Sequence, residues 1–216
     1  MNAKILKDPG STITHFIGMI MALIAGVPFV IKASHNSTIT MIASIIYITS
    51  MVLLYAASST YHFFDISKKI NKILKKIDHM MICILIAGTY TPYCLLVIDG
   101  TFGIVVLSII WSFALIGIVI NAFWITCPKW FSSILYIGMG WTCIIAIPRL
   151  WSGLTPAAFG WLLAGGIVYT IGGVIYALKI SWFDNHFKNF GLHEIFHLFV
   201  MGGSICHYIS LFVYVI

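Results

Sequence analysis

Long apolar runs recur along the whole chain, and they restrict its fold more than any other feature. Each run approaches the roughly 20 residues that an α-helix needs to cross about 30 Å of hydrocarbon. Of the 216 residues, 61% are hydrophobic and only 8% are charged, so the chain lacks the polar residues that would cover a globule in water. The sequence therefore predicts a membrane protein.

The runs predict transmembrane helices rather than barrel strands, because they are continuous and lack a period-two alternation. Turn-forming pairs such as Asp99-Gly100 and Ser152-Gly153 separate them. No linker is long enough to divide domains, so we expect residues 1–216 to form one all-α membrane domain. The expected seven spans cover about 13–32, 39–63, 77–98, 102–124, 130–149, 156–178 and 191–215.

Lysine and arginine residues predict the orientation of this seven-helix bundle. With seven spans, the N-terminus shares a side of the membrane with the loops after spans two, four and six. Basic loops stay in the cytoplasm, so the N-terminus is expected inside and the C-terminus outside. Membrane topology also explains the net charge of +6, and nucleic-acid binding is excluded. The opposite side carries only Lys32 and Arg149, whereas the inner side carries Lys4, Lys7, Lys68, Lys69, Lys72, Lys75, Lys76, Lys129, Lys179 and Lys188.

Three histidines at the ends of distant spans form the clearest candidate site. His193 and His197 are four residues apart at the start of the seventh span, so they face the same way on a helix. His62 ends the second span, and the expected topology puts all three at the cytoplasmic level. Three imidazoles with one open position are typical of a catalytic zinc site. We therefore predict a Zn²⁺ centre, although imidazoles also suit iron, copper and nickel.

Two further polar residues are expected at this level and are our candidate catalytic residues. Asp78 is expected in the first turn of the third span, where it could deprotonate a water or accept a hydrogen bond from an imidazole. Ser58 precedes His62 by four residues and shares its helical face, so its hydroxyl could orient water or a substrate carbonyl. Ionisable groups within membrane spans are costly and point to function.

Glu194 completes the pattern His193-Glu194-x-x-His197, which is that of zinc metalloproteases with a glutamate as general base. A protease is therefore an alternative, although its third ligand would usually come from farther along the chain.

The remaining histidines suggest weaker roles. His15 is expected in the first turn of span one, near enough to support the ligands. His207 lies about 15 Å deeper than His197, where an interhelical hydrogen bond is expected. His79 is expected to point about 100° away from Asp78. His35 and His186 are expected to be solvated loop residues.

A polar patch inside the third span is expected to have a structural role. Pro92 predicts a kink, and hydroxyl side chains can satisfy the carbonyls that a kink frees. The patch consists of Thr89, Tyr90, Thr91 and Pro92.

Four motifs resemble the bacterial hemolysin III proteins, which belong to the progestin and adipoQ receptor family. The resemblance covers nearly the whole chain. The motifs are Ser58-Ser59-Thr60-Tyr61-His62, Ile77-Asp78-His79, Ala87-Gly88-Thr89-Tyr90-Thr91-Pro92, and His193-Glu194-Ile195-Phe196-His197 with Cys206-His207.

The resemblance implies a seven-helix bundle with an internal N-terminus and with zinc near the cytoplasmic face. The family's zinc histidines fall on His62, His193 and His197, its serine on Ser58 and its aspartate on Asp78. One segment departs from the family, which often has acidic residues and Asn ahead of the Thr-His of helix one. In this chain Asp8-Pro9-Gly10-Ser11 precedes Thr14-His15.

These features favour a zinc-dependent hydrolase of the cell membrane that cleaves an amide or ester bond of a membrane lipid. The resemblance points the same way, because eukaryotic relatives are linked to ceramide hydrolysis and bacterial members to haemolysis and membrane-lipid homeostasis. Two alternatives remain. One is a non-enzymatic, receptor-like or regulatory protein with structural zinc, and the other is a pore-forming cytolysin.

Overall fold

The structure is a computed structural model that describes residues 7–98, 100–124, 126–178 and 191–216. The described residues form helices and no strand, and seven helical segments are long and apolar enough to cross a membrane. The predicted all-α, seven-span fold is therefore confirmed. In chain order the elements are α1 (Pro9–Ser34), α2 (Thr38–Phe63), α3 (Lys68–Leu96), α4 (Gly100–Phe123), α5 (Lys129–Trp141), the 3₁₀-helix η1 (Thr142–Ala146), α6 (Ile147–Gly153), α7 (Pro156–Leu178) and α9 (Leu192–Tyr214).

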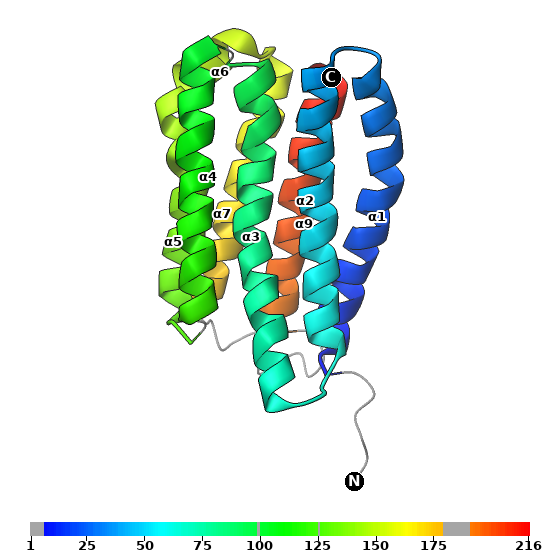
Figure 1. The fold of residues 1–216 in the computed structure, drawn as a ribbon, viewed down its shortest axis with the longest axis vertical. Coiled ribbons are helices and arrows are strands. Elements are labelled where there is room, and N and C mark those ends of the chain that lie inside the picture. The colour runs from blue at the N-terminus through cyan, green and yellow to red at the C-terminus, as the bar shows by residue number, and fades with distance from the viewer. Residues whose placement is uncertain (1–6, 99, 125, 179–190) are drawn as a thin grey trace.

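The helices run side by side along the long axis, and the start of α1 and the end of α9 lie at opposite ends of the bundle (Figure 1). Their contacts close a ring in the order α1, α2, α3, α5, α7, α9 and back to α1, while α4 packs outside the ring against α3 and α5. The first and last spans therefore become neighbours, and this brings the start of α1 to the start of α9.

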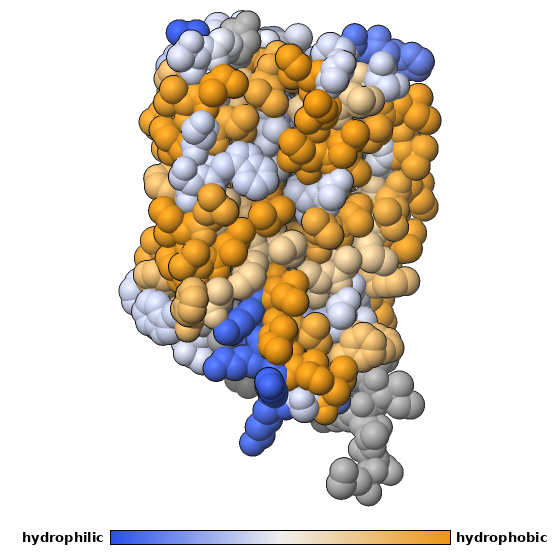
Figure 2. Space-filling view, viewed as in Figure 1, coloured by the Kyte–Doolittle hydropathy of each residue, from blue (hydrophilic) through white to orange (hydrophobic). Residues whose placement is uncertain are grey.

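Helix α1 shows how the sequence produces this packing. Its buried positions recur every three or four residues and carry mostly small or polar side chains, namely Ser11, Thr12, His15, Gly18, Ala22, Gly26, Phe29 and Ala33. Large apolar residues such as Ile24 and Val27 face outward. Lipid supplies no hydrophobic drive between helices, so small residues that allow close approach occupy the interfaces. The resulting apolar belt covers the visible face between two more hydrophilic ends (Figure 2).

Helix α3 begins earlier than the sequence predicted. It starts at Lys68, and the Ser67 side chain caps it by accepting a hydrogen bond from the backbone N–H of Ile70. Lysine is a good helix former, so the basic segment continues the helix beyond the apolar run. Asp78 is consequently about three turns into α3, and its expected position in a first turn is wrong.

The fifth span was predicted as a single helix over 130–149, but it is interrupted by η1 between α5 and α6. The Tyr90 hydroxyl of α3 satisfies backbone groups at this break. It donates to the carbonyl of Gly140 and accepts a hydrogen bond of 2.7 Å from the N–H of Cys143. Nearby, the Thr91 hydroxyl donates to the carbonyl of Ala87, one turn earlier in α3. Tyr90 and Thr91 therefore have the structural use that the sequence indicated, while Thr89 and Tyr90 also line an internal cavity.

Replacing Gly103 by alanine is expected to destabilise the bundle by about 1–3 kcal/mol, because an added Cβ would overpack the α3–α4 contact. That Cβ would clash with the carbonyl oxygen of Cys94, and a backbone atom cannot rotate away. Thermal unfolding in detergent measures the effect. The matched control is Gly160→Ala in α7, where a Cβ meets nothing within 4 Å. Equal melting temperatures for the two variants would contradict this packing.

Candidate metal centre

The structure brings together the three histidines predicted to bind a metal. His62 is in the last turn of α2, and His193 and His197 are in the first two turns of α9. The Nε2 atoms of His62 and His193 are 3.0 Å apart, and the ligand atoms of all three residues lie within 4.8 Å of one another. In a tetrahedral site with Zn–N bonds of about 2.0–2.1 Å, ligand nitrogens are roughly 3.3 Å apart. The cluster therefore has the composition and the spacing to hold a metal ion, and the predicted meeting of these helix ends is confirmed.

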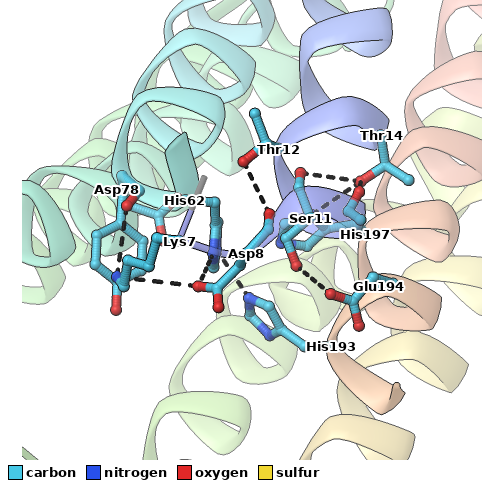
Figure 3. A network of polar contacts seen from close by, with 12 residues as sticks. Lys7, Asp8, Ser11, Thr12, Thr14, His62, Asp78, His193, Glu194 and His197 are labelled. Atoms are coloured by element: carbon cyan, nitrogen blue, oxygen red, sulfur yellow. Dashed lines mark hydrogen bonds and ion pairs between the residues drawn. The ribbon is translucent and has the colours of Figure 1, made fainter. Parts of the chain in front are cut away.

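These imidazoles lie close together (Figure 3), and the end of α2 and the start of α9 that carry them lie at the same end of the bundle (Figure 1). His62 is 3% exposed and His197 is 2% exposed, while His193 is partly buried. Burying several imidazoles side by side is costly unless their polar atoms find partners. A shared cation would satisfy the nitrogens that face one another.

The first turns of α1 surround this cluster. A carboxylate oxygen of Asp8 lies 3.0 Å from Nδ1 of His62, and the Thr14 hydroxyl lies 3.3 Å from Nδ1 of His197. The sequence reasoning missed both contacts. The available signal was the position of Asp8, an acidic residue shortly before the first apolar run.

The sequence left open whether His15 supports the ligands, and in the structure its ring contacts one of them. Its ring stacks on His197 with centroids 3.6 Å apart and an interplanar angle of 7°. Both ring nitrogens of His15 are buried without a hydrogen-bond partner. The contact is therefore one of ring stacking and not of hydrogen bonding.

Asp78 and Ser58 are buried and line the same cavity as His193 and His197. Asp78 also lies close to its neighbour, because its Oδ2 is 3.3 Å from Nδ1 of His79. The expectation that His79 points away from Asp78 is therefore wrong. The angle of 100° per residue describes Cβ directions, and a ring can still swing back toward the preceding side chain. That Asp78 and Ser58 are catalytic stays a prediction.

Glu194 serves the helix start and not the metal cluster. Its Oε2 accepts a hydrogen bond of 2.8 Å from the N–H of Gly191, which caps α9. Its Oε1 accepts one of 2.7 Å from the Ser11 hydroxyl of α1. Because both oxygens are engaged away from the histidines, the geometry does not support the metalloprotease alternative.

His207 differs from its expectation. Its ring stacks on Tyr169 with centroids 5.4 Å apart, and its Nδ1 is buried without a hydrogen-bond partner. The predicted interhelical hydrogen bond is therefore not made through Nδ1. The Nε2 side of the ring packs against α7, where a Cβ on Gly165 would lie 2.8 Å away. His35 is exposed after the end of α1, as expected, and His186 lies outside the described residues.

A cavity of about 200 Å³ extends from the histidine cluster into the bundle. His193, His197 and Asp78 line one end, and Ile98 and Leu150 line the other. Apolar side chains of the ring helices cover most of its wall. The centre therefore opens on a space suited to an apolar chain.

Lys7 adds a positive charge beside the centre. Its ammonium lies 3.5 Å above the ring of Tyr61 and 4.0 Å from Asp8. Partial burial lowers the pKa of Lys7, and the neighbouring carboxylate of Asp8 opposes this effect.

Comparison with known proteins decides the family. The chain matches the family described as "Haemolysin-III related" over residues 3–208. It belongs to the haemolysin III family. This haemolysin III chain is 36% identical to "Hemolysin-3" of Bacillus cereus over all of its own length and 95% of that protein. It is 39% identical to the "Hemolysin-3 homolog" of Bacillus subtilis (strain 168) over 93% of its own length and 90% of that protein.

A more distant similarity agrees with the wider family that the sequence suggested. The haemolysin III chain is 23% identical to the "Adiponectin receptor protein" of Drosophila melanogaster over 95% of its own length and 50% of that protein. Together with the seven apolar helices, these relationships identify a multi-pass integral protein of the cell membrane.

Proposed function

We propose that this haemolysin III protein binds zinc through His62, His193 and His197 and hydrolyses an amide or ester bond of a membrane lipid. The observation that carries the proposal is the histidine cluster at the polar end of an otherwise apolar cavity. An amphiphilic substrate suits such a site, because its acyl chain can lie along the apolar wall while its amide or ester group reaches the histidines.

Zinc bound there would act as a Lewis acid and would make water a nucleophile near neutral pH. The side chains of the protein would transfer the proton, orient the carbonyl and bind the acyl chain. The Asp78 carboxylate takes the proton that the attacking water loses and returns it to the leaving amine or alcohol. The Ser58 hydroxyl donates a hydrogen bond to the carbonyl oxygen and orients it. The apolar cavity wall binds the acyl chain and keeps bulk water from the reacting bond.

The proposed site faces the cytoplasm. This orientation rests on the basic residues, because the lysine-rich start of α3 lies at the same end of the bundle as the start of α1 and the end of α2, which carries His62 (Figure 1). A substrate would then enter from the inner leaflet of the membrane.

Metal removal and replacement test this proposal. Protein reconstituted in lipid nanodiscs is stripped with a chelator and then supplied with Zn²⁺, and fatty-acid release from a ceramide and from a phospholipid is measured. Release is expected to stop without metal and to return with zinc. Unchanged release by the metal-free protein, or none by the zinc-loaded protein with either lipid, would contradict the hydrolase.

One observation favours a structural metal as the second candidate. The cluster joins the end of α2 to the start of α9, two helices that both pack against α1 in the closed ring. A metal that binds only the folded state at 100 times its Kd stabilises that state by about 2.7 kcal/mol. Chelation would then lower the melting temperature although neither lipid is consumed. The pore alternative gains no support from the cavity, because its wall is mainly apolar.

A further inference from the structure

Thr14 of α1 and Asp8, the N-cap residue of α1, each contact the imidazole of one predicted metal ligand. Asp8 contacts Nδ1 of His62, and Thr14 contacts Nδ1 of His197. In both rings the atom contacted is Nδ1, which leaves Nε2 as the free ligand atom. The Nε2 of His62 is also the atom that approaches His193.

The hydrogen bonds of Thr14 determine which tautomer of His197 it holds. The Thr14 hydroxyl has a single proton, and the backbone carbonyls of Gly10, at 3.0 Å, and Ser11, at 3.1 Å, are both placed to accept it. With that proton donated to a carbonyl, the hydroxyl oxygen accepts from Nδ1–H of His197. In this arrangement Nε2 keeps the lone pair that a metal ligand needs.

Asp8 holds His62 in the same tautomer, because a carboxylate oxygen can only accept from Nδ1–H. The Asp8 carboxylate makes this contact in place of the usual N-cap hydrogen bond. An aspartate at the N-cap normally accepts a hydrogen bond from the first turn of its helix, but the Asp8 side chain makes no such bond at the start of α1. Its carboxylate is directed to His62 (Figure 3).

The main chain keeps Asp8 in place without help from its side chain. The N–H of Asp8 donates to the carbonyl of His62 at 3.0 Å, and the N–H of Lys7 donates to that of Phe63 at 3.3 Å. The carbonyl of Asp8 accepts from both the N–H and the hydroxyl of Thr12. Changing the Asp8 carboxylate should therefore leave the segment where it is.

We propose that Asp8 and Thr14 are positioning residues, which fix the tautomer and direction of His62 and His197 so that both Nε2 atoms face one metal ion. This inference rests on the proposed metal site. Partners that hold a ligating histidine by its other N–H typically contribute about 10–100-fold to metal affinity. Asp8 should contribute more than Thr14, since a charged acceptor bonds more strongly than a neutral one.

The test is the affinity of the metal-free protein for Zn²⁺ alone, measured by competition with a chelating dye. Asp8→Asn is expected to raise the Kd about 10–100-fold, and Thr14→Val roughly 3–10-fold. Thr14→Ser keeps the hydroxyl and should restore the wild-type value. The matched control is Asp65→Asn, an exposed aspartate after α2 whose partner is Asn71, and it should leave the Kd unchanged.

A second measurement separates positioning from simple stabilisation. Thermal unfolding of the metal-free proteins should give the same melting temperature for wild type, Asp8→Asn and Asp65→Asn. An unchanged Kd in both Asp8→Asn and Thr14→Val would overturn the inference, as would affinity losses matched by equal losses of metal-free stability. If the wild type binds no zinc, the proposed function fails as well. If it binds zinc with equal affinity in all variants, only this inference fails.

Discussion

Replacing His197 by alanine is expected to abolish zinc binding and lipid turnover together. His197 is the most deeply buried of the three histidines, and its loss leaves two imidazoles that cannot complete a catalytic type of site. The loss of zinc affinity should exceed the roughly 10–100-fold loss expected when a residue that only positions a ligand, such as Asp8, is replaced. Zinc per protein, measured by elemental analysis, and fatty-acid release from lipid report the two losses separately.

A matched control for this variant is His35→Ala, because His35 is exposed after the far end of α1. It should keep full zinc content and full turnover. Circular dichroism of both variants checks that the helices remain. A folded His197→Ala protein that retains one zinc and wild-type turnover would show that the cluster is not the metal centre.

Replacing Gly166 by phenylalanine is expected to reduce turnover of long-chain lipids at least tenfold while zinc content stays at the wild-type level. Gly166 of α7 lines the cavity, and a Cβ there meets no atom within 4 Å, so the ring would enter open space without a clash at its base. A phenyl group occupies much of a cavity of about 200 Å³, which leaves little room for an acyl chain. Initial rates with ceramides of increasing acyl length measure the effect.

Gly160→Phe is the corresponding control in the same helix. Its Cβ also meets nothing within 4 Å, but Gly160 is exposed and does not line the cavity. This variant should turn over all acyl lengths normally. Equal activity of the two variants would mean that the acyl chain does not occupy the cavity, whatever the role of the metal.

The sequence alone predicts the three clustered histidines but not where every helix begins. The triad His62, His193 and His197 was predicted from helical spacing and span topology, because both depend on local geometry and on the thickness of a bilayer. The position of Asp78 within its helix was not predicted correctly. Hydropathy marks where the hydrocarbon of the membrane begins and not where a helix begins. The lysine-rich turns before Asp78 are helical and polar at once.

The contacts between α1 and the histidine cluster could not be predicted from the sequence, for a different reason. Asp8 is the N-cap residue of α1, and only the closed ring shows that its carboxylate meets His62, 54 residues away. Glu194 is the opposite case, since a protease motif is present in the sequence but both carboxylate oxygens bond to Ser11 and Gly191.

The amino-acid sequence by itself determined that this protein lies in a membrane, how many helices cross it and which histidines can share an ion. These properties follow from apolar run length and from the period of the helix. The tertiary structure decided which side chains support those histidines, which helices enclose the cavity and which motif residues serve only as caps. Such choices depend on the packing of α1 against both α2 and α9. No local pattern encodes that packing, because it arises only when helices far apart in the chain close the ring.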